Sequence, residues 1–286
     1  KSMFIYPEPV RFVYELVKDW PDRPLLMYDM AHVLGLYGAF QAPFEEGADI
    51  VTGSTHKTFF GSQRGLIAGN IAQGSPWPQL WTDIQSRAFP GSTSNHHLGT
   101  LLGLLLSTYE MNEFKEPYQA QVRKNAKALA RYLREAGIPV EGDEADGFTE
   151  THQVLIRVKQ FGNGQELARR LEDNNIITNY QALPDDTTFL ESSGLRLGVQ
   201  EMTRFGMKEK DFEILAGLIA EVVRKNKTVK DEVKRYRQNF LEMQYCLPEK
   251  EAVELAANLF LSLFPARGVG QKLVENLASK VKEQAG

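Results

Sequence analysis

The sequence contains a single cysteine and no long apolar run. Cys246 is the only thiol among 286 residues, so the chain cannot form an internal disulfide. Such cysteine usage is typical of a reducing compartment, and we expect a cytoplasmic protein. The longest apolar stretch, residues 101–106, is far shorter than the roughly 20 apolar residues that a membrane-spanning helix needs. We therefore expect no membrane partner.

The sequence also lacks a block of basic residues and a metal-binding motif. Its 33 basic and 37 acidic residues give a net charge of −4, which does not favour nucleic-acid binding. His96 and His97 are neighbours, and adjacent side chains rarely reach one ion. No cysteine or acidic residue stands near them at the spacing of metal ligands. We therefore expect neither a nucleic-acid partner nor a metal site.

One stretch, residues 50–58 (IVTGSTHKT), has the pattern of a strand that ends in a polar turn. Its β-branched residues favour an extended backbone, and the turn presents Lys57. A lysine acts as a nucleophile only when its amine is partly neutral, which requires desolvation or a nearby positive charge. The alternative is an ordinary surface lysine, because most lysines are exposed.

A second stretch, residues 25–32 (LLMYDMAH), is a short apolar run that ends in Asp29 and His32. A continuous apolar run is typical of a strand buried on both faces of an α/β sheet. Functional groups of such folds lie at the ends of strands. The two stretches together therefore indicate a site that contains an acid, a histidine and a lysine.

Several short motifs together resemble the serine (glycine) hydroxymethyltransferase family. They are DMAHVLGL at 29–36, STHKT at 54–58, AFPG at 88–91 and SGLRLG at 193–198. The run QEMTRFGM at 200–207 most resembles the archaeal branch, and the similarity extends to about residue 230. The resemblance implies an α/β fold of the aspartate-aminotransferase-like type that binds pyridoxal 5′-phosphate. The chain would hold part of the mixed-sheet large domain and a small α+β C-terminal domain.

The resemblance also implies roles for individual residues. Lys57 would hold the cofactor as a Schiff base, Asp29 would pair with the pyridine nitrogen, and Ala31 would pack on the ring. A carboxylate at the ring nitrogen keeps it protonated, so that the ring can accept electrons. His32 would lie near the phenolic oxygen of the cofactor, and the catalytic residues would be Lys57, His32 and Thr55.

The resemblance implies further roles for residues at the periphery of the same site. Thr55 and His56 would line it, and Arg196 would bind the carboxylate of the amino-acid substrate. Arginine suits this task because its planar fork donates two parallel hydrogen bonds. Ser94 and Asn95, in the loop after Pro90, would bind the cofactor phosphate of a neighbouring subunit. We therefore expect a homodimer or a larger assembly with the site at the interface.

The activity that the resemblance implies is the interconversion of serine and glycine. A reduced pterin, tetrahydrofolate or tetrahydromethanopterin, would carry the one-carbon unit, and retro-aldol cleavage would leave a glycine quinonoid. The segment at 181–184 (QALP) departs from the family pattern where the carrier binds. A threonine aldolase or transaldolase that uses no pterin is therefore an alternative.

The family also has a long region before the strand that ends at Asp29, and this sequence begins shortly before that strand. We expect the chain to be the C-terminal part of a longer enzyme and to be inactive by itself. A non-catalytic subunit or fragment is a further alternative.

The order of patterns predicts three parts: residues 1–115 in the large domain, 116–230 in the small domain, and 231–286 as a helical extension. Residues 98–110 are strongly apolar and predict a buried helix. Pro117 is expected to open a separate helix, whose apolar positions recur at helical spacing until Gly137 stops it. Residues 73–81, with two prolines and two tryptophans, predict a surface loop.

Overall fold

The computed structural model of the chain describes residues 2–71, 77–188 and 191–263, together with residues 268, 270, 272–273, 275–276 and 279–280. The chain divides into two compact units, Lys1–Tyr245 and Cys246–Gly286. Within the described parts, none of the helices combines the length and the apolar character needed to cross a membrane.

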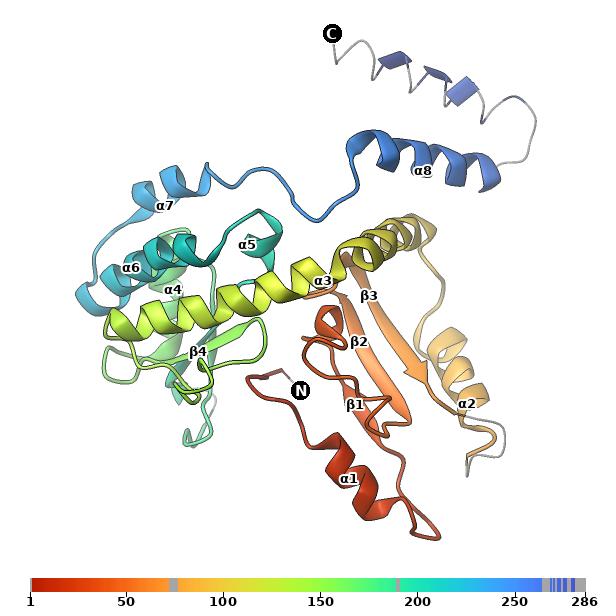
Figure 1. Cartoon of the computed structure of the whole chain (residues 1–286), viewed down its shortest axis with the longest axis horizontal. Helices are drawn as coiled ribbons and strands as arrows, with labels where there is room; N and C mark the ends of the chain where they lie inside the picture. The colour runs from red at the N-terminus through yellow and green to blue at the C-terminus, as the bar shows by residue number, and fades with distance from the viewer. Residues whose placement is uncertain are drawn as a thin grey trace. The chain divides into compact units, whose positions relative to one another are not determined.

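The first unit begins with a mixed three-stranded sheet (Figure 1). Helix α1 (Val10–Val17) precedes β1 (Met27–Asp29), which pairs in parallel with β2 (Ile50–His56). Strand β3 (Phe60–Gly69) pairs with β2 in the antiparallel direction. This arrangement confirms the predicted helix followed by three strands of a mixed sheet. A short 3₁₀ turn, η1 (Leu34–Leu36), follows β1.

The segment after β3 differs from the predicted surface loop. Helix α2 (Leu80–Ser86) begins inside the range 73–81, and a π-helical turn, η2 (Arg87–Ser92), follows it. Residues 73–76 of that prediction lie outside the described part of the chain. The two prolines and two tryptophans dominated the sequence pattern, although Trp81 lies in α2. This short helix buries none of its side chains.

The predicted pair of helices is one continuous helix, α3 (Leu98–Glu135), which contains Pro117. Two predictions were therefore wrong. Pro117 does not open a helix, and the first turns are not buried, since Leu98 is 61% and Leu101 43% exposed. The second half of α3 is buried instead, and it packs against β4 (Gln153–Arg157) and α6 (Glu209–Lys225).

A second sheet has the strand order β4-β6-β5 and is antiparallel throughout. Strand β6 (Gly194–Gly198) lies in the middle, beside β5 (Asn179–Gln181). The helices that accompany it are α4 (Gly164–Asp173), α5 (Gln200–Arg204), α6 and α7 (Lys230–Arg237). The predicted α+β character of this part of the chain is therefore present.

The second unit contains α8 (Glu249–Leu263). This helix agrees with the amphipathic segment of the sequence, and the expected stop at Pro265 lies outside the described residues. The division of the chain at residues 115 and 230 stays a prediction.

Candidate active site

Asp29 lies at the carboxyl end of β1, where the sequence predicted a functional acid. Its Oδ1 accepts a hydrogen bond of 2.9 Å from the backbone N–H of Ala31. The next residue, Met30, is fully buried, and its N–H donates to the carbonyl of Thr52 on β2. The backbone around the acid is therefore fixed on both sides, while the carboxylate itself is exposed. Asp29 also lines a cavity of about 450 Å³.

Lys57 follows the end of β2, in the tight turn that leads into β3. Its Nζ donates to the Oγ of Ser54 at 3.4 Å, and its side chain is partly buried. The pairing of β2 with β3 is irregular between Ser54 and His56, which redirects the strand before the lysine. Among the described residues, no carboxylate forms an ion pair with Lys57.

Thr58 connects the two strand ends, and sequence reasoning missed it. Its hydroxyl donates to the carbonyl of His32 at 2.8 Å and accepts from the N–H of Gly35 at 3.0 Å. The hydroxyl of Tyr118 on α3 donates to the carbonyl of Thr58 at 2.9 Å. The turn after β1, the turn after β2 and helix α3 are thus tied together at one buried residue.

The other two residues predicted from this turn differ in their surroundings. Thr55 is buried, and its hydroxyl lies 2.6 Å from the carbonyl of Ser62 and 3.1 Å from that of Arg64. These contacts hold the β2–β3 hairpin. His56 is exposed. The roles of both residues toward a cofactor stay predictions.

His32 is the residue at which the predicted groups meet. Burial, followed by the positive charges of Lys57 and Arg196, lowers its pKa to about 4, while Asp29 acts in the opposite direction. A charge shifts the pKa of an imidazole in this way only when it lies near the ring. Asp29, Lys57 and Arg196 therefore all lie near His32, and their roles toward a common ligand stay predictions.

Arg196 reaches this space from the middle strand of the second sheet. It pairs with Leu155 of β4 and Asn179 of β5, and its Nη1 donates to the carbonyl of Ser2 at 2.9 Å. Burial lowers its pKa. In the part of the chain that is described, no carboxylate forms an ion pair with this guanidinium.

His152 and Gln153 belong to the same cluster, and no sequence motif pointed to them. The ring of His152 stacks on that of His32, and burial lowers its pKa to about 3, with further contributions from His32, Arg196 and Lys57. The Nδ1 of His152 is buried without a hydrogen-bond partner among the described residues. Gln153 lies 3.2 Å from His32 through its Nε2.

Ser94 and Asn95 are not part of the cluster within this chain. Both are exposed between η2 and α3, and Asn95 accepts a hydrogen bond from the N–H of His96. The loop is linked to β3 because Arg64 donates to the carbonyl of His97 at 3.0 Å and to the hydroxyl of Thr100 at 2.8 Å. The resemblance implies that these residues bind the cofactor phosphate of a neighbouring subunit, and this role stays a prediction.

The groups that gather around His32 fit the cofactor that the resemblance implies. They include one acid at a strand end, one amine without an acidic partner and one guanidinium that can bind a carboxylate. No group of three or more metal-ligating side chains occurs in the described residues. The acid, the amine and the guanidinium suit an organic cofactor and an amino-acid substrate.

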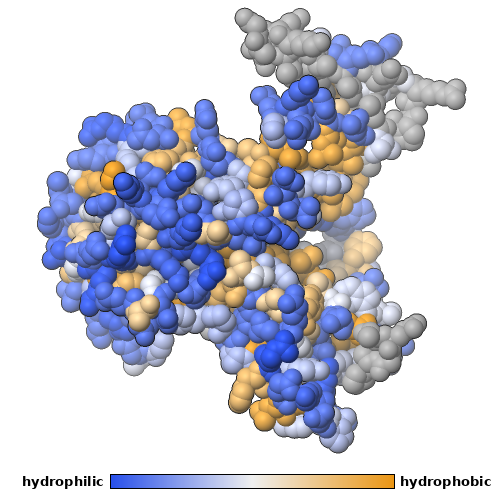
Figure 2. Space-filling model, in the orientation of Figure 1, coloured by the Kyte–Doolittle hydropathy of each residue, from blue (hydrophilic) through white to orange (hydrophobic). Residues whose placement is uncertain are grey.

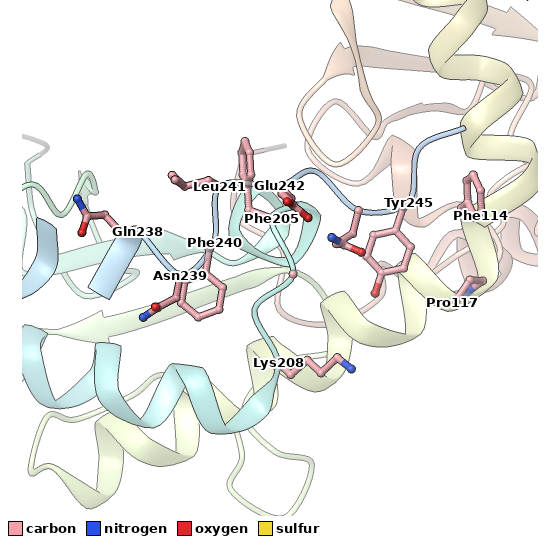
Figure 3. A pocket seen from close by; sticks show the side chains of 12 residues that line it. Phe114, Pro117, Phe205, Lys208, Gln238, Asn239, Phe240, Leu241, Glu242 and Tyr245 are labelled. Atoms are coloured by element: carbon pink, nitrogen blue, oxygen red, sulfur yellow. The ribbon is translucent and has the colours of Figure 1, made fainter. Parts of the chain in front are cut away.

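A larger cavity, of about 710 Å³, lies elsewhere in the first unit (Figure 3). It is lined by Phe114 and Pro117 of α3, by Phe205 and Lys208, and by the segment 238–245. None of the predicted site residues lines it. Its larger volume alone is therefore no reason to assign this cavity to the site around His32.

A comparison with protein families matches residues 15–219 to the family described as serine hydroxymethyltransferase. Serine hydroxymethyltransferase from Archaeoglobus fulgidus is 42% identical over 88% of this chain and 57% of its own length. The protein of that name from Methanothermobacter thermautotrophicus is 43% identical over 88% of this chain and 58% of its own length. The chain thus spans a little more than half the length of these curated relatives.

A solved structure is also similar. It is the L-threonine transaldolase from Pseudomonas fluorescens in its internal aldimine state, with a TM-score of 0.78 and 37% identity. The match covers 91% of this chain and 58% of the transaldolase chain. This likeness supports the predicted aspartate-aminotransferase-like fold.

Proposed function

Because this chain belongs to the serine hydroxymethyltransferase family, we propose that it forms the lysine-bearing part of an enzyme that interconverts serine and glycine. The enzyme would use pyridoxal 5′-phosphate as cofactor and a reduced pterin as one-carbon carrier. The observation that supports the proposal is that the charges of Lys57, Asp29 and Arg196 all lie near enough to His32 to shift its pKa. Archaeal relatives bear the name of this activity.

The proposed mechanism divides the work among these residues. When bound, pyridoxal phosphate supplies an electron sink for negative charge on the substrate. The amine of Lys57 would hold the cofactor, and the carboxylate of Asp29 would keep a proton on its ring nitrogen. Arg196 orients the amino acid by its carboxylate, because a guanidinium fork fixes both distance and direction. Burial keeps His32 neutral near pH 7, so it can donate and accept hydrogen bonds beside them.

The role of Lys57 can be tested on the full-length protein by reduction with borohydride and mass spectrometry of the peptides. We expect the reduced cofactor on the peptide that contains Lys57, and no label there in a Lys57→Ala variant. Lys210→Ala is the matched control, since Lys210 is an exposed lysine of α6. A label that persists in Lys57→Ala at the same stoichiometry would refute the assignment.

The second candidate is a threonine transaldolase, which the similar solved structure favours. Both activities cleave a Cα–Cβ bond next to a hydroxyl, so the same residues serve either one. Turnover of serine with and without tetrahydropterin, compared with turnover of threonine and an aldehyde, separates them. Serine cleavage that does not depend on the pterin would favour the transaldolase.

We also propose that the enzyme is a cytoplasmic homodimer or larger assembly, with Ser94 and Asn95 at the cofactor phosphate of the neighbouring subunit. Exposed apolar side chains support an interface, because large ones seldom gather on the surface of a monomer. Leucines line the first turns of α3, and Phe12 of α1 is 69% exposed. Figure 2 shows apolar surface, in orange, in the region of α1 as well. Light scattering of the full-length protein measures the assembly.

A further inference from the structure

Two hydrogen bonds with backbone groups fix the orientation of the side-chain amide of Gln153. Its Oε1 accepts a hydrogen bond of 2.7 Å from the N–H of Phe4, and its Nε2 donates to the carbonyl of Ser2 at 3.0 Å. A backbone N–H can only donate, and a backbone carbonyl can only accept. Rotating the amide by half a turn would therefore set donor against donor and acceptor against acceptor.

This orientation has a consequence for His32. The Nε2 of Gln153 carries two hydrogens, of which one is used by Ser2, and it lies 3.2 Å from the Nδ1 of His32. A hydrogen on Nδ1 would face another hydrogen, so Nδ1 must offer its lone pair. A neutral imidazole with an acceptor at Nδ1 carries its hydrogen on Nε2.

We propose that Gln153 is a positioning residue that holds His32 in the neutral tautomer with the hydrogen on Nε2. His32 then offers Nε2–H as a hydrogen-bond donor on the side of the ring away from Gln153. That this donor serves the cofactor or the substrate rests on the proposed function. The tautomer itself rests only on the contacts of Gln153.

The other groups around His32 are compatible with this state. Lys57 and Arg196 are positively charged, and both disfavour an additional positive charge on His32. The ring of His152 is stacked on one side of the imidazole. The negative charge of Asp29 favours protonation of His32. The backbone carbonyl of His32 accepts from Thr58, which fixes the main chain that carries the ring.

The tautomer can be measured directly in the full-length protein labelled with ¹⁵N-histidine. Long-range ¹H–¹⁵N spectra distinguish a protonated from an unprotonated ring nitrogen, and a His32→Gln variant identifies the signals of this residue. At pH 7, without cofactor, we expect Nδ1 of His32 to be unprotonated and Nε2 to carry the hydrogen. A hydrogen on Nδ1 in the wild-type spectrum would overturn the proposal.

Two variants test whether Gln153 is the cause. In Gln153→Glu the carboxylate only accepts, so we expect the hydrogen to move to Nδ1 or the ring to become doubly protonated at a higher pH. In Gln153→Leu we expect a mixture of tautomers. Gln121→Leu is the matched control, because Gln121 bonds to Asn125 and Glu209 and touches no histidine. An unchanged His32 tautomer in Gln153→Glu would refute the proposal.

The outcome is independent of catalysis. The measurement needs no turnover, so a failure of the proposed serine–glycine activity leaves the tautomer result intact. Conversely, labelled Lys57 together with the wrong His32 tautomer would reject only the role of Gln153. If Gln153→Glu does not fold, the wild-type spectrum and Gln153→Leu still decide between the two states.

Discussion

The imidazole ring of His152 lies nearly parallel to that of His32, with ring centres 6.3 Å apart and an interplanar angle of 14°. His152 is buried and His32 is half-buried. Two stacked imidazoles cannot both become charged at low cost in a site that also contains Lys57 and Arg196. The pair is therefore neutral in the folded protein at pH values at which free histidine is protonated.

The first prediction is a loss of stability in mild acid. Burial, followed by the nearby charges, lowers the pKa of His32 to about 4 and that of His152 to about 3. Below the unfolded value of about 6.5 the unfolded chain binds protons that the folded chain does not bind, so stability falls as pH falls. Each pKa unit corresponds to about 1.4 kcal/mol, so between pH 6.5 and pH 5 the loss for the two residues together is a few kcal/mol.

Urea unfolding of the full-length protein between pH 6.5 and pH 5 isolates this effect, because ordinary carboxylates titrate mainly below that range. We expect the midpoint to fall steadily across the range in the wild type and less steeply in His152→Phe. His96→Ala should retain the wild-type slope, since His96 is exposed. Equal slopes in all three proteins would contradict the prediction.

The second prediction concerns the affinity for the amino acid. Arg196→Lys keeps the charge but loses the fork that donates two parallel hydrogen bonds. A charge-assisted hydrogen bond contributes about 1.5–3 kcal/mol, so we expect KM for the amino acid to rise about ten- to hundredfold. Arg131→Lys, on the exposed side of α3, is the control. Unchanged KM in Arg196→Lys would remove this residue from the substrate site.

The local part of the fold could be predicted from the sequence. Strands β1, β2 and β6 follow from short apolar or β-branched runs, and the acid at 29 and the amine at 57 follow from their position at strand ends.

In α3 the proline at position 117 led to the wrong prediction of a helix start. The proline costs about 3 kcal/mol inside a helix. Tyr118 and Val122 are fully buried just after it, and burying a large apolar side chain contributes about 1.5–3 kcal/mol.

The partners of His32 could not be predicted in the same way. Gln153 lies 121 positions further along the chain, and His152 lies beside it in the other sheet. No spacing rule relates residues that meet only after the two sheets pack. Thr58 illustrates the same limit, because its hydroxyl completes contacts with the turn after β1 rather than with neighbours in sequence.

The third prediction uses the close approach of Gly35 to the turn that carries Lys57. A Cβ at position 35 would lie 2.2 Å from the backbone carbonyl atoms of Thr58. Backbone cannot give way as a flexible side chain does, so Gly35→Ala must displace the turn. We expect a clear loss of stability, and a loss of cofactor attachment at Lys57 that exceeds the fraction unfolded.

Gly217→Ala is the control for this change. Position 217 lies in α6, and an added Cβ there meets nothing within 4 Å. Replacing glycine by alanine inside a helix stabilises by about 0.5–1 kcal/mol. Thermal unfolding should therefore shift in opposite directions for the two variants. A Gly35→Ala protein as stable as the wild type would show that the turn can move without cost.

The fourth prediction concerns the ion pair between Glu110 of α3 and Arg204 of α5. The Nη2 of Arg204 lies 2.8 Å from Oε2 of Glu110, both side chains are buried, and the guanidinium carbon lies 3.5 Å from the ring centre of Phe60. Removing one member of a buried pair leaves an uncompensated charge, which costs about 3–5 kcal/mol. We expect Glu110→Ala to lose that amount of unfolding free energy.

Two further variants separate this cause from a general effect of removing an acid from α3. Glu135 forms an exposed pair with Arg131 at 3.7 Å, and Glu135→Ala should cost at most about 1 kcal/mol. Glu110→Leu combined with Arg204→Met removes both charges and should recover much of the loss, because apolar replacements of a buried pair are often neutral. Urea denaturation measures all three. Equal losses for Glu110→Ala and Glu135→Ala would contradict the prediction, because the buried Glu110–Arg204 pair would then contribute no more than an exposed one.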